Sequence, residues 1–319
     1  MFLTKVRPSL WKQSSVTLRR GWVNGKCFAT VASSSDFDEV MNLVKQRSID
    51  YFYAGCMLPE CMKVPFFVAQ CFNTEVAAVR DHINGNVIAG RMRLQWLRDE
   101  INNHYEKNTV GATATLKCLF QMIDDYKWSF SFLDRIIEAR ELDLNDDTIQ
   151  SCTDLDTYGE CIFGSLGFLL MQSFGIVDDH MVEAWQRFSH TMAYGLLLRG
   201  TPYHFKHNKT YFPKDVCEKF GLLPIKACDL NSDAVRNVVK HLTDTALQNY
   251  KEAAAIWKEG SKGENKAFED MVLLTTPSVF YLEQLRKHDY FILNKSLSSP
   301  FMNVKLQNRL LVQKKLHRY

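Results

Sequence analysis

The chain has 319 residues, 46% of them hydrophobic and 24% charged, which is typical of one large globular domain or two smaller ones. Its net charge of +3 is uneven: residues 1–35 carry six Lys and Arg and no acidic residue, and the rest has 33 basic and 36 acidic residues. A nearly neutral main part lacks the clustered basic field that broad nucleic-acid binding requires.

Residues 1–35 are also rich in serine and threonine. Arg-rich, Ser-rich and acid-free segments are typical of organelle import signals, so we predict a mitochondrial transit peptide over residues 1–35, followed by a domain over residues 36–319. A disordered basic tail is the alternative. A secretory signal fits less well, because no uninterrupted apolar core of about 7–15 residues follows the first charges.

Beyond residue 36 the apolar residues recur with helical spacing almost throughout. Helices are predicted over residues 37–44, 59–79, 88–105, 113–122, 132–139, 158–174, 179–198, 234–256, 268–274, 279–285 and 306–316. Breaks are predicted at residues 84–86, 145–147, 200–213, 260–263 and 298–300, where Gly, Pro, Asn and Asp gather. With no alternating strand pattern and no long linker, the chain is predicted to be a single all-α domain.

Two further patterns bear on location. Nine cysteines with no Cys-x-x-Cys spacing predict buried free thiols in a reducing compartment. The longest uncharged run, residues 161–177, is short and contains three glycines, so a buried helix is expected there and no membrane-spanning segment.

The last fifteen residues, 305–319, combine several leucines with five basic side chains. Such a helix can lie on an anionic membrane surface, or it can pack on the domain with a solvated basic face. The sequence leaves both alternatives open. The residues concerned are Leu306, Leu310, Leu311 and Leu316 with Lys305, Arg309, Lys314, Lys315 and Arg318.

Residues 198–213 read Leu-Arg-Gly-Thr-Pro-Tyr-His-Phe-Lys-His-Asn-Lys-Thr-Tyr-Phe-Pro. This segment resembles, without a gap, the second aspartate motif of the squalene/phytoene synthase family, Leu-Arg-Asp-x-x-x-Asp-x-x-x-Gly-Arg-x-Tyr-Leu-Pro. Arg199 and the closing Tyr-x-Pro are kept, whereas Gly200 and His204 stand at the two aspartate positions. Four further segments resemble family motifs in the same order: residues 51–59, 91–98, 136–144 and 158–167.

The resemblance implies an isoprenoid-synthase (trans-prenyltransferase) helical bundle around a central cavity. In that family, aspartates on two helices hold the Mg²⁺ ions that neutralise a diphosphate leaving group. The first motif falls on Ala77, Ala78 and Asp81, so only Asp81 keeps a carboxylate. The resemblance therefore implies a pseudoenzyme with no catalytic residues, no bound metal and no cofactor.

Other side chains could replace the missing ligands. The acidic pairs at 124–125, 146–147 and 178–179 are more simply helix caps, and His204 with His207 is weak evidence for a metal. Arg199, Lys206, Lys209 and Tyr211 could contact an anionic group. Alternatively, Arg199 pairs with a structural carboxylate and Tyr211 packs the loop against the domain.

Residues 72–81, Phe-Asn-Thr-Glu-Val-Ala-Ala-Val-Arg-Asp, resemble more closely a mitochondrial branch of the family that assists the assembly of respiratory complex I (NADH:ubiquinone oxidoreductase). This implies complex I subunits or assembly intermediates as partners, and a peripheral position on the matrix side of the inner membrane, with residues 305–319 as the candidate contact. The alternatives are an active prenyl-diphosphate transferase with unusual metal ligation, and an isoprenoid or lipid carrier.

Overall fold

The computed structural model describes residues 32–83, 85–145, 149–223, 228–261 and 265–316, and the predicted import signal lies almost wholly outside them. The described residues are helical with no β-strand, as the sequence predicts. They fall into two compact units. The first unit comprises the described residues up to 55 and residues 59–145 and 165–177. The second unit comprises residues 56–58 and the described residues of 146–164 and 178–319.

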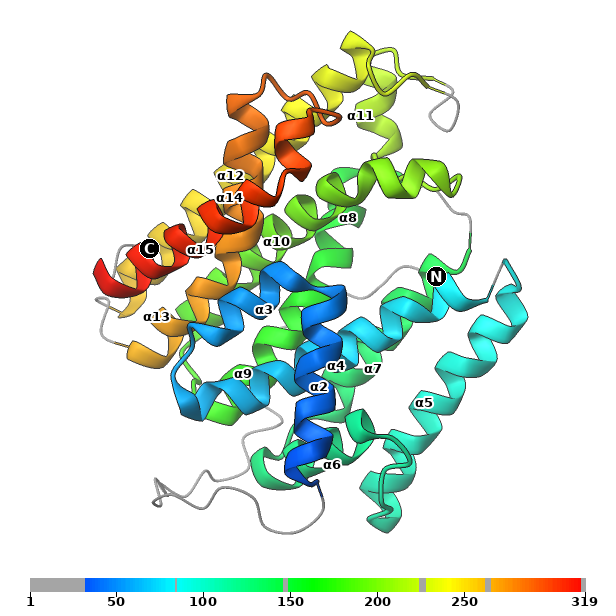
Figure 1. The fold of residues 1–319 in the computed structure, drawn as a ribbon, viewed down its shortest axis with the longest axis vertical. Coiled ribbons are helices and arrows are strands. Elements are labelled where there is room, and N and C mark those ends of the chain that lie inside the picture. Colours follow the sequence, from blue (N-terminus) through cyan, green and yellow to red (C-terminus); the bar gives the residue numbers. More distant parts are fainter. Residues whose placement is uncertain (1–31, 84, 146–148, 224–227, 262–264, 317–319) are drawn as a thin grey trace. The chain divides into compact units, whose positions relative to one another are not determined.

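The first unit is built around the long helix α4 (Glu60–His82), which packs against five other helices. Its apolar residues include Phe66, Phe67 and Phe72, all buried, and the middle of the helix is buried on all sides. The helices around it are α2 (Ser34–Arg47), α5 (Val87–Lys107), α6 (Ala114–Tyr126), α7 (Phe130–Asp143) and α9 (Ser165–Phe174), and α3 (Ile49–Cys56) precedes it in the chain (Figure 1).

Helix α2 begins at Ser34 with a capping box, in which Ser33 accepts from the Asp36 amide and Asp36 accepts from the Ser33 amide. Lys117 on α6 lies 3.2 Å from the Asp36 carboxylate. Asp36, the first residue of the predicted domain, thus lies in the first turn of α2, and the boundary itself stays a prediction.

The second unit is built around α10 (Asp179–Lys206), which packs against α8 (Cys152–Gly159), a π-helical turn (Glu160–Gly164), α12 (Asp233–Ser261) and α14 (Thr276–Lys287). Small residues allow the close approaches that the sequence predicts for this region: a Cβ on Gly159 would lie 3.0 Å from the Ala193 Cβ. The remaining elements of the unit are α11 (Lys214–Lys219), α13 (Lys266–Val272), the 3₁₀ turns Leu273–Thr275 and Lys295–Ser298, and α15 (Pro300–Leu316).

The predicted break at residues 200–213 is partly wrong, because α10 continues through Gly200 and Pro202 and ends only at Lys206. Pro202 removes one backbone donor from the helix. The preceding residue, Thr201, is buried, and its hydroxyl donates to the Leu197 carbonyl at 3.0 Å. Packing of this last part of α10 outweighs the local helix-breaking signal.

Proline occurs twice near the start of α4: Pro59 is its N-cap, and Pro65 lies inside the helix beyond its first turn. Two smaller expectations also need correction. The helix predicted over residues 158–174 is divided by the π-turn. Among the described cysteines, all are free, but Cys61 is exposed rather than buried. Within the described ranges, no helix has the length and apolar content needed to cross a bilayer.

Candidate functional site

The first-motif positions lie in the second half of α4, in the first unit. Ala77 is half-buried, Ala78 is buried and Asp81 is exposed. Ala77 and Asp81 are four residues apart and so share one face of the helix. Of the three positions, this stretch of α4 therefore offers one carboxylate, at the solvent-exposed end.

Glu75 precedes these positions and is held by α6. The Thr115 hydroxyl donates to Glu75 Oε1 at 2.9 Å and lies 3.3 Å from the Cys71 sulfur. Burial raises the pKa of the Glu75 carboxyl, although the Thr115 hydrogen bond and the charge of Arg93 oppose that shift. Glu75 is thus bound within the helix packing of the unit and does not substitute for an aspartate at position 77.

The second-motif positions lie on the last turns of α10, in the second unit. The imidazole of His204 folds back over Gly200: a Cβ placed on Gly200 would lie 2.6 Å from His204 Nε2. Carbon and nitrogen atoms in contact stay well beyond that distance, so any side chain at position 200 would require the His204 ring to move. The imidazole of His204 therefore occupies the space beside Gly200.

Arg199 is directed toward α14. Burial lowers the pKa of the Arg199 guanidinium, and the nearby Tyr281 phenol opposes that shift. In return, Arg199 lowers the pKa of Tyr281, which burial raises above its ordinary value. Arg199 and Tyr281 are therefore electrostatic neighbours across α10 and α14, and the pairing of Arg199 with a structural carboxylate stays a prediction.

The segment after α10 packs back onto its end. The Tyr211 ring lies 4.9 Å from the His204 ring and 5.9 Å from the Tyr158 ring, measured between centroids. Lys209 is only 4% exposed, and its Nζ is 5.7 Å from the Tyr211 centroid. His204, Lys209 and Tyr211 therefore form one packed group, as the structural alternative for Tyr211 predicts. Lys206 is exposed.

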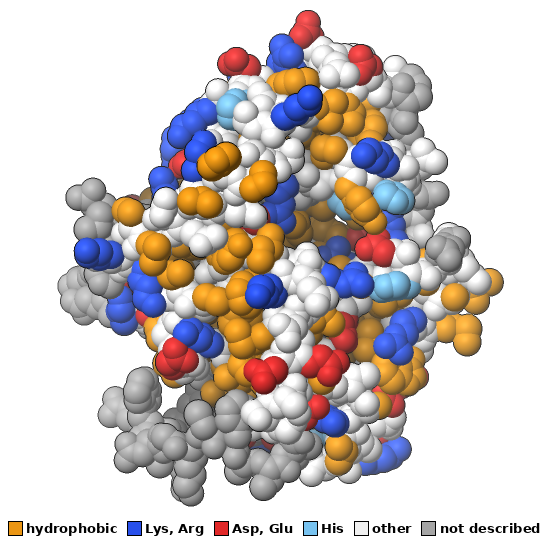
Figure 2. Space-filling view, viewed as in Figure 1, with side chains coloured by type: hydrophobic (Ala, Val, Ile, Leu, Met, Phe, Trp, Pro, Cys, Tyr) orange, Lys and Arg blue, Asp and Glu red, His pale blue; other side chains and the backbone are white. Residues whose placement is uncertain are grey.

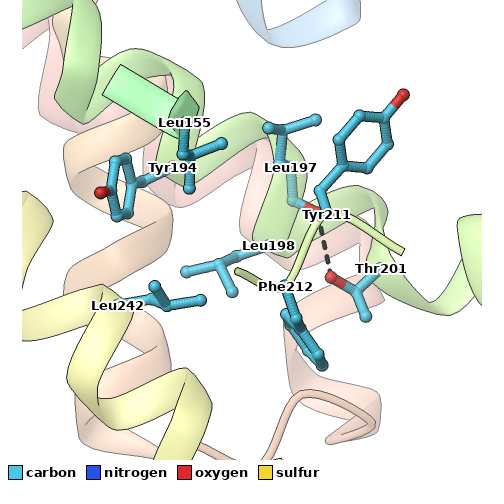
Figure 3. Close-up of a pocket in the computed structure, with 8 residues that line it drawn as sticks. All are labelled: Leu155, Tyr194, Leu197, Leu198, Thr201, Tyr211, Phe212 and Leu242. Atoms are coloured by element: carbon cyan, nitrogen blue, oxygen red, sulfur yellow. Dashed lines mark hydrogen bonds between the residues drawn. The ribbon is translucent and has the colours of Figure 1, made fainter. Parts of the chain in front are cut away.

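A small apolar pocket lies behind this segment (Figure 3), with a volume of about 10 Å³. That volume accommodates about one water molecule, whereas ligand sites usually measure about 300–1,000 Å³. Figure 3 shows the Tyr211 ring turned away from Leu198 and Leu242. The lining residues are Leu155, Tyr194, Leu197, Leu198, Thr201, Tyr211, Phe212 and Leu242.

The two other acidic pairs that the structure describes occupy different positions in their helices. Asp178 is the N-cap of α10 and accepts from the Met181 amide at 2.9 Å, as predicted. Asp124 and Asp125 are not caps: they lie in the last turn of α6, where the helix dipole disfavours negative charge. Asp124 instead lies 3.3 Å from Nε2 of the buried His104, and the pair at 146–147 lies outside the described residues.

No cluster of three or more potential metal-ligating side chains occurs in the described part of the chain. His207 Nδ1 lies 2.9 Å from the Tyr203 carbonyl oxygen, and the two rings are 4.3 Å apart. His207 is the C-cap residue of α10. The described contacts of its ring are with Tyr203, one turn earlier in the same helix.

A polar group that the sequence analysis missed lies beside the π-turn. His190 on α10 has Nε2 at 2.9 Å from Glu160 Oε1 and Nδ1 at 3.6 Å from Asp156 Oδ1. Asp156 and Glu160 are four residues apart and could have been found by that spacing. Since the imidazole lies between them, these carboxylates are engaged in holding α8 and the π-turn to α10.

Comparison with known proteins places the chain in a family of prenyl-diphosphate enzymes. The sequence model of the squalene/phytoene synthase family matches residues 44–306, so the chain belongs to this family. The matched region runs through both units, in agreement with the predicted single all-α domain.

Individual proteins of this family also match the chain over most of its length. The chain is 27% identical to mouse "NADH dehydrogenase (ubiquinone) complex I, assembly factor 6" over 264 residues, covering 82% of this chain and 77% of the mouse protein. Identity to the human protein of the same name is 25%, over 81% of this chain and 76% of that one. The Dictyostelium discoideum homolog is 24% identical, over 86% and 78%.

Solved structures show the same fold. A dehydrosqualene synthase superposes with a TM-score of 0.71 at 16% identity, covering 88% of this chain and 97% of the other. The squalene synthase HpnC from Alicyclobacillus acidocaldarius gives 0.67 at 19% identity, covering 80% and 95%. The isoprenoid-synthase fold predicted from the sequence is thereby confirmed.

Proposed function

We propose that this protein is a non-catalytic factor for the assembly of mitochondrial respiratory complex I, acting on complex I subunits or assembly intermediates on the matrix side of the inner membrane. The observation that carries the proposal is the match, over about four-fifths of both chains, to mammalian proteins named complex I assembly factor 6. The acid-free, Arg- and Ser-rich residues 1–35 support the mitochondrial location.

The side chains at the motif positions support the absence of catalysis. Ionising an allylic diphosphate requires Mg²⁺ held by oxygen ligands. At the positions that align with the family's aspartates, α4 carries Asp81 alone, and the imidazole of His204 covers Gly200. Metal-assisted charge neutralisation provides several kcal/mol of transition-state stabilisation, and about 1.4 kcal/mol corresponds to tenfold in rate. Without those ligands almost no activity is expected.

The first experiment removes the gene and measures respiratory complexes on native gels. We expect complex I to be lost selectively, and expression of the parent chain to restore it. The Asp81→Ala variant should restore complex I equally well, because the exposed Asp81 carboxylate has no catalytic role in this proposal. Normal complex I in the deletion strain would contradict the assembly role.

The second experiment incubates the purified protein with Mg²⁺ and farnesyl or geranylgeranyl diphosphate. We expect no turnover above a protein-free control. Turnover that Asp81→Ala abolishes would establish an active transferase instead. A stoichiometric prenyl lipid detected by native mass spectrometry would favour the carrier alternative.

A further inference from the structure

The C-terminal helix α15 has two different faces. Its inner face is buried: Met302, Leu306 and Leu310 are at most 8% exposed. Gln313 on the same face accepts a hydrogen bond from the Thr276 hydroxyl of α14 at 2.8 Å. The helix is therefore docked on the second unit through this face, as one of the two alternatives for residues 305–319 predicts.

The outer face is also apolar, which packing on the domain does not explain. Phe301 is 75% exposed, Val304 is 54% exposed, and Leu311 and Val312 are each 51% exposed. Spacings of three, seven and one residues place all four on one side of a helix. Single exposed apolar residues are ordinary, but an aligned set with polar surroundings marks an interaction surface.

Basic side chains lie on and beside this outer face, with Lys315 among the apolar side chains. Lys305, Lys314 and Lys315 are exposed, and Arg309 lies 3.5 Å from Glu283 of α14. Residues 290–319 contain six Lys and Arg and no Asp or Glu. Figure 2 shows hydrophobic and basic side chains side by side over α15, on the left of the view. The charge of this region is thus of one sign along its whole length.

We propose that the outer face of α15, defined by Phe301, Val304, Leu311 and Val312, docks the protein onto an anionic phospholipid bilayer. The helix would lie in the plane of the interface, with the four apolar side chains below the headgroups and the lysines at the level of the phosphates. Charge complementarity favours this occupant, because a bilayer with negative headgroups matches the exposed lysines of α15.

The test uses flotation of the full-length chain with vesicles of phosphatidylcholine, with or without phosphatidylglycerol. Binding is expected only with the anionic lipid, and salt should weaken it. The variant Phe301→Gln/Leu311→Gln should bind at least about tenfold less, since each removed side chain contributes burial energy. The variant Lys314→Gln/Lys315→Gln should lose roughly fivefold per charge.

A matched control removes exposed apolar side chains elsewhere. Ile88 and Met92 on α5 are 72% and 70% exposed, and Ile88→Gln/Met92→Gln should bind vesicles as the parent chain does. Glutamine is a good helix former, so all of these substitutions leave helix propensity nearly unchanged, and circular dichroism checks the fold.

Because residues 1–35 are also basic, a second readout locates the contact. A photoreactive phospholipid in the same vesicles should crosslink to peptides of α15, as identified by mass spectrometry. Crosslinks confined to residues 1–35, unchanged binding of both α15 variants, or no binding by the parent chain would overturn the proposal. If the parent chain bound an acidic protein but no vesicles, and the α15 substitutions weakened that binding, the outer face of α15 would be a site for a protein partner and the proposal would be wrong.

Vesicle binding involves no complex I component, so this test and the native-gel test of the proposed function fail independently.

Discussion

Replacing Gly195 with alanine tests the close approach of α10 and α14. Gly195 lies in the middle of α10, where alanine would ordinarily stabilise a helix by about 1 kcal/mol. Here a Cβ would lie 2.5 Å from the Cβ and 2.8 Å from the Cα of Ser278 on α14. Carbon atoms in contact normally stay about 3.5–4.0 Å apart. One of the two clashing atoms is backbone, so α10 and α14 must separate.

The cost can be estimated from the contacts that separation breaks. Inserting one extra methyl group into a packed contact costs about 1–3 kcal/mol. The hydrogen bond from the Ser278 hydroxyl to the Met192 carbonyl, at 3.1 Å, contributes a net of about 1 kcal/mol more. After the gain in helix propensity, Gly195→Ala should reduce the free energy of unfolding by about 1–3 kcal/mol.

Urea and thermal denaturation, followed by circular dichroism, measure this difference. At about 2–4 °C per kcal/mol for a domain of 150–250 residues, the melting temperature should fall by about 2–12 °C. Gly200→Ala is the matched control: it meets only the imidazole of His204, a side-chain end, and should destabilise less. A Gly195→Ala variant as stable as the parent chain would refute the close approach of the two helices.

Three further predictions concern the two units. Asp178→Ala removes the N-cap of α10 and should cost about 1 kcal/mol of unfolding free energy in urea titrations. Because burial raises the pKa of Glu75 above its ordinary 4.5, folding favours the protonated carboxyl: its stabilisation is present below pH 4.5 and is lost as pH rises through the raised pKa. Glu75→Gln should therefore be more stable than the parent chain at pH 7 and equally stable at pH 4, and a stability difference independent of pH would contradict this. Burial raises the pKa of the Cys71 thiol to about 12, so iodoacetamide at pH 8 should alkylate the exposed Cys61 well before Cys71, as peptide mass spectrometry would show.

The fold could be predicted from the sequence because helical periodicity is a local property. Long amphipathic or fully buried helices such as α4 and α12 follow directly from the spacing of their apolar residues. The end of α10 could not be predicted in this way. Gly200 and Pro202 are local helix-breaking signals, and the packing that overrides them involves residues distant in sequence.

For the candidate site, too, local features could be predicted from the sequence and tertiary contacts could not. The identities of the side chains at positions 77, 78, 81, 200 and 204 are visible in the sequence. The contacts of the side chains in and beside these motifs depend on tertiary packing. Glu75, for example, accepts a hydrogen bond from Thr115 on α6, and Arg199 lies beside Tyr281 on α14. Likewise Asp124 was expected to be a cap because acidic pairs often are, and its pairing with His104 depends on how α5 and α6 meet.

Positions 200 and 204 on α10 are linked by geometry. His204 folds back over the helix where residue 200 has no Cβ, and a side chain at 200 would require the His204 ring to move, because that ring lies 2.6 Å from where the Cβ would be. The ring is held from its other side by Tyr211, at 4.9 Å between centroids. An aspartate placed at position 200 alone would therefore meet the imidazole, and one placed at 204 alone would remove the contact with Tyr211. On our prediction that positions 77, 78, 200 and 204 align with aspartates of the family, a metal site would need substitutions at both 200 and 204 together with carboxylates on α4, and no single substitution would create one.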